Sequence, residues 1–178
     1  QMDVLQCDFS KIKRAMSEKP LRIIGNLPYN ISTPLIFHLL DQLGEIEDML
    51  FMLQKEVALR LAAKPGSRHY GRLSVMTSLE IDCECVLDVP PSAFEPPPKV
   101  DSIVIRMRPR KTRQEKFDKY HLSKLVTAAF GQRRKTLRNA LKSVVTNDQF
   151  EFAEIDSSLR AESISPEDFI RLSNACLR

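Results

Sequence analysis

Two short, nearly continuous apolar runs stand out in the first third of the chain. They cover residues 21–25 and 49–53, and an amphipathic stretch at 34–43 separates them. Continuous apolar runs are typical of parallel strands that are covered on both faces. In the stretch between them, Thr33 is placed to cap a helix and Pro34 occupies its first position. The pattern predicts a strand, a helix and a second strand.

The middle of the chain has the pattern of half-exposed strands. Apolar and charged residues alternate over 81–89, and residues 100–107 form another strand-like run. The Pro-rich segment 90–98 between them lacks the backbone donors that a regular element needs. We therefore expect an antiparallel pair at a sheet edge. A helix is predicted from about Gln54, and a short strand that ends in a carboxylate at residues 4–8.

The last third of the chain is predicted to be helical, because its apolar residues recur at helical spacing. These stripes consist of Leu122, Leu125, Val126 and Ala129, and of Leu137, Leu141 and Val144. Ser165 and Pro166 mark the start of a last helix. The predicted fold is α/β, with a sheet domain over residues 1–108 and a small all-helical domain over 109–178.

Positive charge is concentrated in one segment of the chain. The formal net charge is +4, but residues 106–142 carry 13 Lys+Arg against 2 Asp+Glu, or +11. The segments before and after it have net charges of −3 and −4. A basic block of this size attracts polyanions through counterion release, so nucleic acid is the expected partner.

Several other classes of function are disfavoured by composition. No apolar run is long enough to cross a membrane and no secretion signal is present, so we expect a cytoplasmic protein without membrane contact. The four cysteines include no CxxC pair and the three histidines are scattered. No metal site is predicted, and the cysteines are expected to be reduced.

The strongest chemical signal follows the first apolar run directly. It is the tetrapeptide Asn26, Leu27, Pro28 and Tyr29. Open α/β sheets place their ligand sites at the carboxyl ends of strands. The tetrapeptide offers an amide oxygen, a main-chain carbonyl, a residue without a competing donor, and an aromatic face for an unstacked base. An ordinary strand-to-helix turn would have a similar composition.

Three sequence blocks in order, the first of which contains the tetrapeptide, resemble the ribosomal RNA adenine N6-methyltransferases. The resemblance is closest to their bacterial KsgA/RsmA branch. The blocks are residues 26–32, residues 92–102 and residues 130–136. The resemblance covers essentially the whole chain. It implies a Rossmann-like methyltransferase sheet that uses S-adenosylmethionine. It also implies dimethylation of two adjacent adenosines in the 3′-terminal hairpin of small-subunit rRNA, on an assembling 30S particle.

The resemblance also implies roles for individual residues. Asn26 contacts both the cofactor and the target amine, and Tyr29 and Phe94 sandwich the flipped adenine. Asp8 accepts a hydrogen bond from the adenine amino group of the cofactor. Phe94 could instead be a core residue, and Asp8 a solvated strand end. Leu27 and Pro28 complete the predicted catalytic set.

One departure from the family concerns the cofactor. The family holds S-adenosylmethionine with a Gly-rich turn after the first strand and an acidic residue after the second, and neither occurs here. We expect the first strands of the sheet to be missing, and cofactor binding and activity by this chain alone to be weak or absent. An exposed sheet edge is then predicted, which invites self-association.

A basic surface is predicted to bind RNA. Arg134, Arg138 and Lys142 have the spacing of one helical face, and Arg133 and Lys135 extend it. A solvated helix face is the alternative. Phe130 beside them is included in the predicted RNA-binding set because it could stack a base, but it is interpreted mainly as an anchor of the helix and a wall of the active site.

Two other functions remain open on the sequence. A noncatalytic RNA-binding or ribosome-assembly module would need only the basic segment. A 23S rRNA methylase of the macrolide-resistance type would share the tetrapeptide, although the Ser-Ala-Phe and Gln-Arg-Arg-Lys-Thr contexts at residues 92–94 and 132–136 favour the small-subunit branch.

Overall fold

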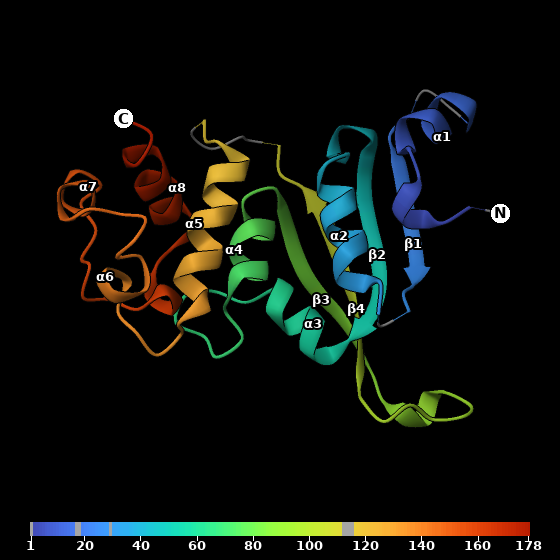
Figure 1. The fold of residues 1–178 in the computed structure, drawn as a ribbon. Coiled ribbons are helices and arrows are strands. Elements are labelled where there is room, and N and C mark those ends of the chain that lie inside the picture. The colour runs from blue at the N-terminus through green and yellow to red at the C-terminus, as the bar shows by residue number, and fades with distance from the viewer. Residues whose placement is uncertain (1, 17–18, 29, 112–115) are drawn as a thin grey trace. The chain divides into compact units, whose positions relative to one another are not determined.

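The chain divides into two units, which are called here the sheet unit and the helical unit. The structure is a computed structural model that describes residues 2–16, 19–28, 30–111 and 116–178 (Figure 1). The sheet unit consists of Gln1–Ala62 and Glu80–Lys111, and the helical unit of Ala63–Leu79 and Thr112–Arg178.

The described residues of the sheet unit form four strands in the order β1-β2-β4-β3. They are β1 (Leu21–Asn26), β2 (Ile46–Gln54), β3 (Ile81–Val89) and β4 (Ser102–Pro109). β1 and β2 are parallel, while β4 pairs antiparallel with both β2 and β3. The predicted parallel pair and the predicted antiparallel pair at the sheet edge are both confirmed.

Short helices precede β1 or lie between the strands. They are η1 (Val4–Gln6), α1 (Phe9–Met16), α2 (Ser32–Leu40), η2 (Leu43–Glu45), α3 (Lys55–Leu61) and η3 (Pro91–Ala93). The helix predicted between the parallel strands is confirmed, although it begins two residues earlier and follows Ile31, which makes no side-chain cap. Its apolar face, with Ile36 and Leu39 each 1% exposed, packs into the core.

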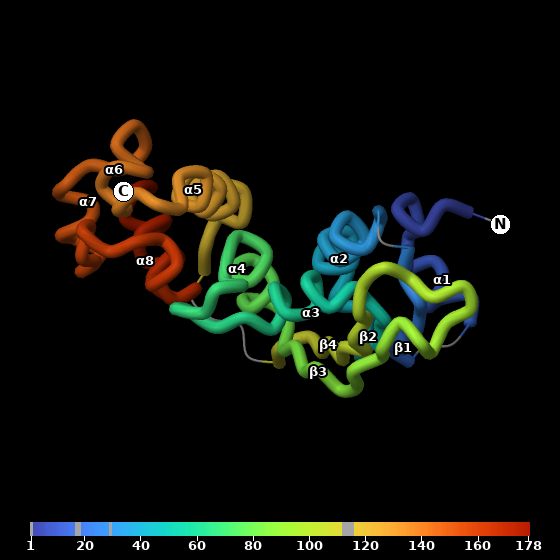
Figure 2. Tube along the Cα trace, turned by 90° about the horizontal axis from the view of Figure 1, so that it is seen from below, coloured from blue at the N-terminus to red at the C-terminus, as the bar shows by residue number. Residues whose placement is uncertain are grey.

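The two faces of the sheet differ in how they are covered. Figures 1 and 2 show α2 and α3 on one face, and none of the described helices of this unit covers the other. On the covered face Phe51 and Ile105 are fully buried, whereas Ile24 on the open face is 77% exposed. The prediction that both parallel strands are covered on both faces was therefore wrong for β1.

Two local predictions in the sheet unit were also wrong. Residues 4–8 form no strand, because Asp3 and Asp8 accept hydrogen bonds from nearby backbone N–H groups and so favour η1 and the start of α1. In β3, the pairing register shifts between Cys85 and Leu87, which is the signature of a bulge. The predicted alternation therefore breaks there, and Leu87 is 60% exposed.

In the described part of the helical unit, five helices pack around one apolar core. They are α4 (Arg72–Ser78), α5 (Lys119–Gly131), α6 (Leu137–Ala140), α7 (Asn147–Phe152) and α8 (Pro166–Ala175), with the turn η4 (Ala161–Ser163). The predicted stripe on α5 is buried throughout. In the next stripe Leu137 and Leu141 are buried, but Val144 is exposed. The predicted Ser165 cap is confirmed, since its side chain accepts from the Asp168 N–H at 3.0 Å.

The division of the chain differs from the predicted domains at one segment. Residues 63–79 precede the last two strands, yet they belong to the helical unit. Their hydrogen bonds explain this, because the Tyr70 hydroxyl donates to the Ile164 carbonyl at 2.8 Å and the Gly66 N–H donates to the Glu162 carbonyl at 2.7 Å. The other break, after Lys111, lies close to the predicted one. Among the described residues, no helix is long and apolar enough to cross a membrane.

Candidate functional site

The predicted tetrapeptide begins on the last residue of β1. Asn26 ends the strand, and the Leu27 N–H extends the ladder by donating to the Met52 carbonyl at 3.2 Å. Gly25 allows a close approach here, since a Cβ on it would lie 3.3 Å from the Leu27 side chain. The Asn26 and Pro28 side chains are exposed and that of Leu27 is buried. The backbone of this turn is therefore fixed by β2.

Two oxygens of this turn are available to a ligand. The side-chain amide of Asn26 and the carbonyl of Leu27 form no hydrogen bond with any described residue. The Pro28 carbonyl, in contrast, accepts from the Ile31 N–H at 3.2 Å. Tyr29, the fourth predicted residue, lies outside the described residues. The turn can thus accept hydrogen bonds from an amino group through two acceptors of different origin.

Phe94 is carried to the same end of the sheet by the loop between β3 and β4. Asn26 pairs with Met52 of β2, and two residues further on Gln54 pairs with Ser102, where the loop returns to the sheet. Figure 1 shows the end of β1 and this loop at the lower end of the unit. Phe94 is half-buried, and its N–H donates to the Pro91 carbonyl at 3.1 Å. The structure therefore brings the loop of the predicted base-stacking residue and the acceptor turn to the same end of the sheet.

Asp8 does not lie with them. Its backbone neighbours are held by Gln42, whose amide accepts from the Phe9 N–H at 2.7 Å and donates to the Cys7 carbonyl at 3.1 Å. Gln42 follows the carboxyl end of α2, whereas Asn26 precedes its amino end. A helix of this length spans about 13 Å. The two predicted cofactor contacts are thus separated by the length of α2, and the described residues do not form one cofactor site around them.

The carboxylate of Asp8 instead caps α1. One oxygen accepts from the Ser10 hydroxyl at 2.6 Å and from the Ser10 N–H at 3.0 Å. Lys11 contributes its N–H at 3.4 Å and its ammonium group at 3.6 Å. The Ser10 side chain, with these backbone donors, lowers the pKa of Asp8 below its usual value. Asp8 therefore stays ionised as a helix cap at neutral pH.

The predicted basic residues are exposed but do not share one helical face. α5 ends at Gly131, and a turn closed by the Lys135 N–H on the Gln132 carbonyl at 2.8 Å follows it. α6 spans only four residues, so Arg138 alone of the basic set is helical. The prediction of a continuous cationic helix was wrong, because the local turn competes with the helix. The basic set Arg133, Arg134, Lys135, Arg138 and Lys142 is exposed throughout.

Few of these cations have a partner. Among the described residues, none of the five lies within an ion pair, and only Arg133 makes a side-chain hydrogen bond, to the Arg68 and Tyr70 carbonyls at 3.3 Å each. Phe130 packs its ring against Tyr70 and Phe169, with ring centroids 6.0 and 5.9 Å apart. These ring contacts support its interpretation as an anchor of the helical unit, and its part in RNA binding stays a prediction.

Comparison with known proteins identifies the family of this chain. A family model described as ribosomal RNA adenine dimethylase matches residues 1–177. The chain belongs to this family. It is 52% identical over 175 residues to the ribosomal RNA small subunit methyltransferase A of Alcanivorax borkumensis, and 54% identical over 177 residues to that of Saccharophagus degradans. These matches cover 98% of this chain and 62% and 65% of the two relatives, so the chain spans less than two thirds of their length.

Solved structures of the dimethylase family and of a related methyltransferase share this fold. A dimethyladenosine transferase from Plasmodium falciparum matches with a TM-score of 0.73 and 27% identity, over 85% of this chain and 64% of that one. The 23S rRNA methyltransferase ErmE matches with a TM-score of 0.69 over 99% of this chain and 70% of its own. At 23% identity, the second match concerns the fold alone.

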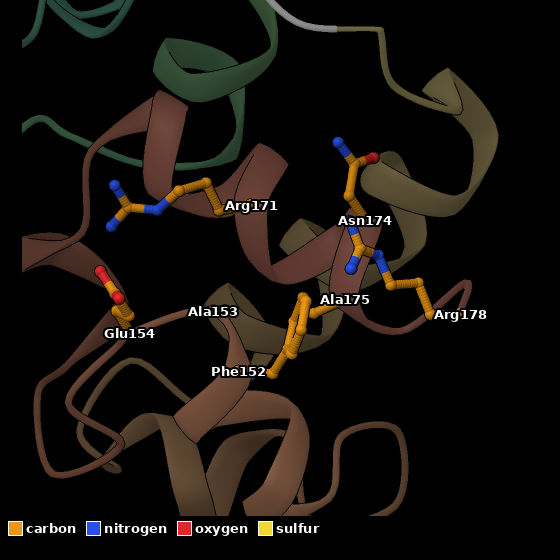
Figure 3. A pocket seen from close by; sticks show the side chains of 7 residues that line it. All are labelled: Phe152, Ala153, Glu154, Arg171, Asn174, Ala175 and Arg178. Atoms are coloured by element: carbon orange, nitrogen blue, oxygen red, sulfur yellow. The ribbon is translucent and has the colours of Figure 1, made fainter.

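A cavity in the helical unit contains none of the family residues predicted above. Its volume is about 180 Å³, and Figure 3 shows the side chains around it. It is lined by Phe152, Ala153, Glu154, Arg171, Asn174, Ala175 and Arg178. Its cations are already engaged, since Arg171 pairs with Asp168 at 2.7 Å and the Arg178 guanidinium lies 4.5 Å from the centre of the Phe152 ring. We do not place the site there.

Two polar residues near the predicted site could not be found from the sequence. Gln42 holds the backbone on both sides of Asp8, although an isolated glutamine gives no signal of such a contact. Lys55 forms an ion pair with Asp88, 33 positions away, and only the fold places the two side chains together. No group of side chains suited to a metal ion occurs in the described ranges.

Proposed function

We propose that this chain carries the adenine-docking and RNA-binding parts of a small-subunit rRNA adenine N6-dimethyltransferase. The reaction proposed is transfer of two methyl groups from S-adenosylmethionine to each of two adjacent adenosines in the 3′-terminal hairpin. The proposed substrate is an assembling 30S particle in the cytoplasm. The observation that carries the proposal is the family match over residues 1–177, in a chain whose acceptor turn and Phe94 loop lie at the same end of the sheet.

The acceptor turn suits an adenine amine. This amine is a poor nucleophile because its lone pair is delocalised into the ring, and acceptors for its N–H groups draw that lone pair toward an incoming methyl group. The free oxygens of Asn26 and Leu27 can supply this polarisation, and the half-buried ring of Phe94 can stack on the base. A monomethylated amine keeps one N–H, so the same acceptors can serve a second transfer.

The basic set is the proposed RNA contact. Five exposed cations without acidic partners lie within ten residues, and residues 130–146 contain no Asp or Glu. Cations whose charge is not neutralised by the protein release the most counterion when they bind phosphates. We propose that they hold the RNA backbone while the sheet unit receives the base.

The cofactor part of the proposal is narrower. We propose that the sheet is part of a Rossmann-like methyltransferase sheet, and that the chain alone binds S-adenosylmethionine weakly. The separation of Asp8 from Asn26 supports this, because the two proposed contacts do not converge. β1 pairs only with β2 among the described strands, so its other edge is open to a second copy.

Two alternatives have support of their own. The lack of converging cofactor contacts favours a noncatalytic RNA-binding or ribosome-assembly module. The tetrapeptide, which a 23S rRNA methylase would share, keeps a 23S rRNA substrate open, although the relatives at about 50% identity carry the small-subunit name. The substrate choice separates the two enzymes, and cofactor binding separates both from the module.

The test combines cofactor titration with methyl transfer. The chain is titrated calorimetrically with S-adenosylmethionine and with a small-subunit 3′ hairpin RNA at two salt concentrations, and methyl transfer to that hairpin is measured. In a chain extended to the full length of the relatives, we expect Asn26→Ala to lower transfer by at least about 100-fold with little change in RNA affinity. Unchanged transfer would overturn the role of Asn26. Salt-sensitive RNA binding without cofactor binding is the expected result for this chain alone, and transfer that stays absent in the extended chain would favour the noncatalytic module.

A further inference from the structure

The loop that carries Phe94 is long for a connection between neighbouring antiparallel strands. It runs from Pro90 to Asp101, and its residues are mostly exposed. A loop of this length needs contacts of its own to hold one aromatic ring in place. Proline restricts the backbone of the loop, but it does not fix where the loop lies relative to the rest of the site.

Both ends of this loop are bound by one residue of a third segment. Lys55 is the first residue of α3, and its backbone N–H donates to the Asp101 carbonyl at 2.9 Å, where the loop ends. Its ammonium group lies 3.0 Å from the Asp88 carboxylate, just before the loop begins. Asp88, and to a lesser degree Asp101, raise the pKa of Lys55. Lys55 therefore remains charged, and it joins the two sides of the hairpin to the end of β2.

We propose that Lys55 is a positioning residue for Phe94, acting through the two ends of the loop. The inference rests on the proposed function, in which Phe94 stacks on the target adenine. Lys55 itself does not contact the base. It follows Gln54, which pairs with Ser102, so its main-chain contact with Asp101 continues the pairing of β2 with β4 by one position. The side chain adds the tie to Asp88 that the main chain alone does not make.

The size of the effect follows from exposure. The side chains of Lys55 and Asp88 are 44% and 74% exposed, so their pairing is screened by water. A pair of this kind changes an equilibrium by about two- to five-fold. The effect is expected in the mobility of the loop and in base stacking, and the fold of the sheet should be unchanged.

A fluorescent reporter makes the position of the loop measurable. The chain contains no tryptophan, so Phe94→Trp places a single indole on the loop. We expect Lys55→Gln in this background to raise acrylamide quenching of Trp fluorescence by about two-fold, and Asp88→Asn to do the same. Arg60→Gln, which removes another exposed cation of α3, is the matched control and should leave quenching unchanged. The exchange Lys55→Asp with Asp88→Lys should restore it.

Adenosine titration connects the loop to the base. Stacking of adenosine on the indole quenches its fluorescence, and Lys55→Gln should weaken this binding by about two- to five-fold. If acrylamide and adenosine quenching are both the same with and without Lys55, the positioning role is overturned. If Lys55→Gln changes acrylamide quenching while adenosine quenches neither protein, the tether holds and stacking by the loop, hence the proposed function, fails. Circular dichroism confirms that each variant keeps the fold.

Discussion

Charged side chains serve different ends in the two units. In the sheet unit they connect strands. The Asp48 carboxylate of β2 accepts hydrogen bonds from Nε and Nη2 of Arg22 in β1, at 2.9 and 2.8 Å, and one from Nη2 of Arg106 in β4 at 2.9 Å. In the helical unit, the basic set lies outside regular helices except for Arg138 in α6, and it makes no ion pair among the described residues. Cations that are satisfied within the protein hold its structure, whereas cations left in water are available to a polyanion.

The cores of the two units also differ in the interactions that stabilise them. The helical unit is closed by an aromatic cluster of Tyr70, Phe130 and Phe169. The sheet unit has one apolar layer beneath α2 and α3 and an open face on which the Asp48 cluster lies. We therefore expect stability to depend on packing in the helical unit and partly on ionisation in the sheet unit.

The largest effect is expected from the aromatic cluster. Phe169 is 0% exposed, so Phe169→Ala should lower the free energy of unfolding of the helical unit by about 3–5 kcal/mol, through lost burial and a residual cavity. Urea unfolding followed by circular dichroism measures it. Phe152→Ala is the control, because that ring is 59% exposed and its loss should change stability little. Equal losses for the two variants would contradict this picture of the core.

Removal of the basic set tests whether its cations bind RNA. Changing all five residues to Gln should weaken binding of the 3′ hairpin more than about 100-fold at low salt, and should reduce the slope of log affinity against log salt by about four. Binding titrations at several salt concentrations measure both. Lys11→Gln with Arg60→Gln removes two cations that have acidic partners in the sheet unit, and should change affinity less than about two-fold. A salt slope that stays the same in the five-residue variant would refute the assignment.

The smallest effect concerns the Asp48 cluster. The Arg22 guanidinium first, and Arg106 with it, hold the pKa of the Asp48 carboxyl well below its usual value against the opposing effect of burial. A lowered pKa in the folded state gives stability that is present above about pH 4 and is lost as the pH falls below that value. Asp48→Asn should therefore cost about 1–3 kcal/mol at pH 7, and less at pH 3.

Urea unfolding of the sheet unit at pH 7, 4 and 3 checks this expectation. The control is Asp82→Asn, because Asp82 pairs with Arg110 at 2.8 Å but its side chain is 66% exposed. It should cost less than Asp48→Asn at pH 7. A variant at Asp48 that loses the same stability at all three values of pH would show that the cluster does not act through ionisation.

Much of the fold followed from local patterns. Apolar runs predicted β1 and β2, alternation predicted β3, and the Ser165-Pro166 pair predicted the start of α8, because each depends on neighbours within a few residues. The same reasoning gave a wrong prediction for residues 4–8. Their apolar content suits a strand, but a strand also needs a partner to pair with, and two Asp side chains offered the backbone a local alternative.

The amino-acid sequence by itself determined the element types, the basic segment and the family of this protein, because periodicity, charge and motif order are properties of the chain. Only the tertiary structure decided which groups meet. It brought the Phe94 loop to the end of the sheet where Asn26 lies, and it joined Lys55 to Asp88. It also kept Asp8 next to Gln42, which follows the carboxyl end of α2. Such contacts depend on strand register and on the path of loops, which sum interactions over the whole unit, and no short stretch of sequence contains them.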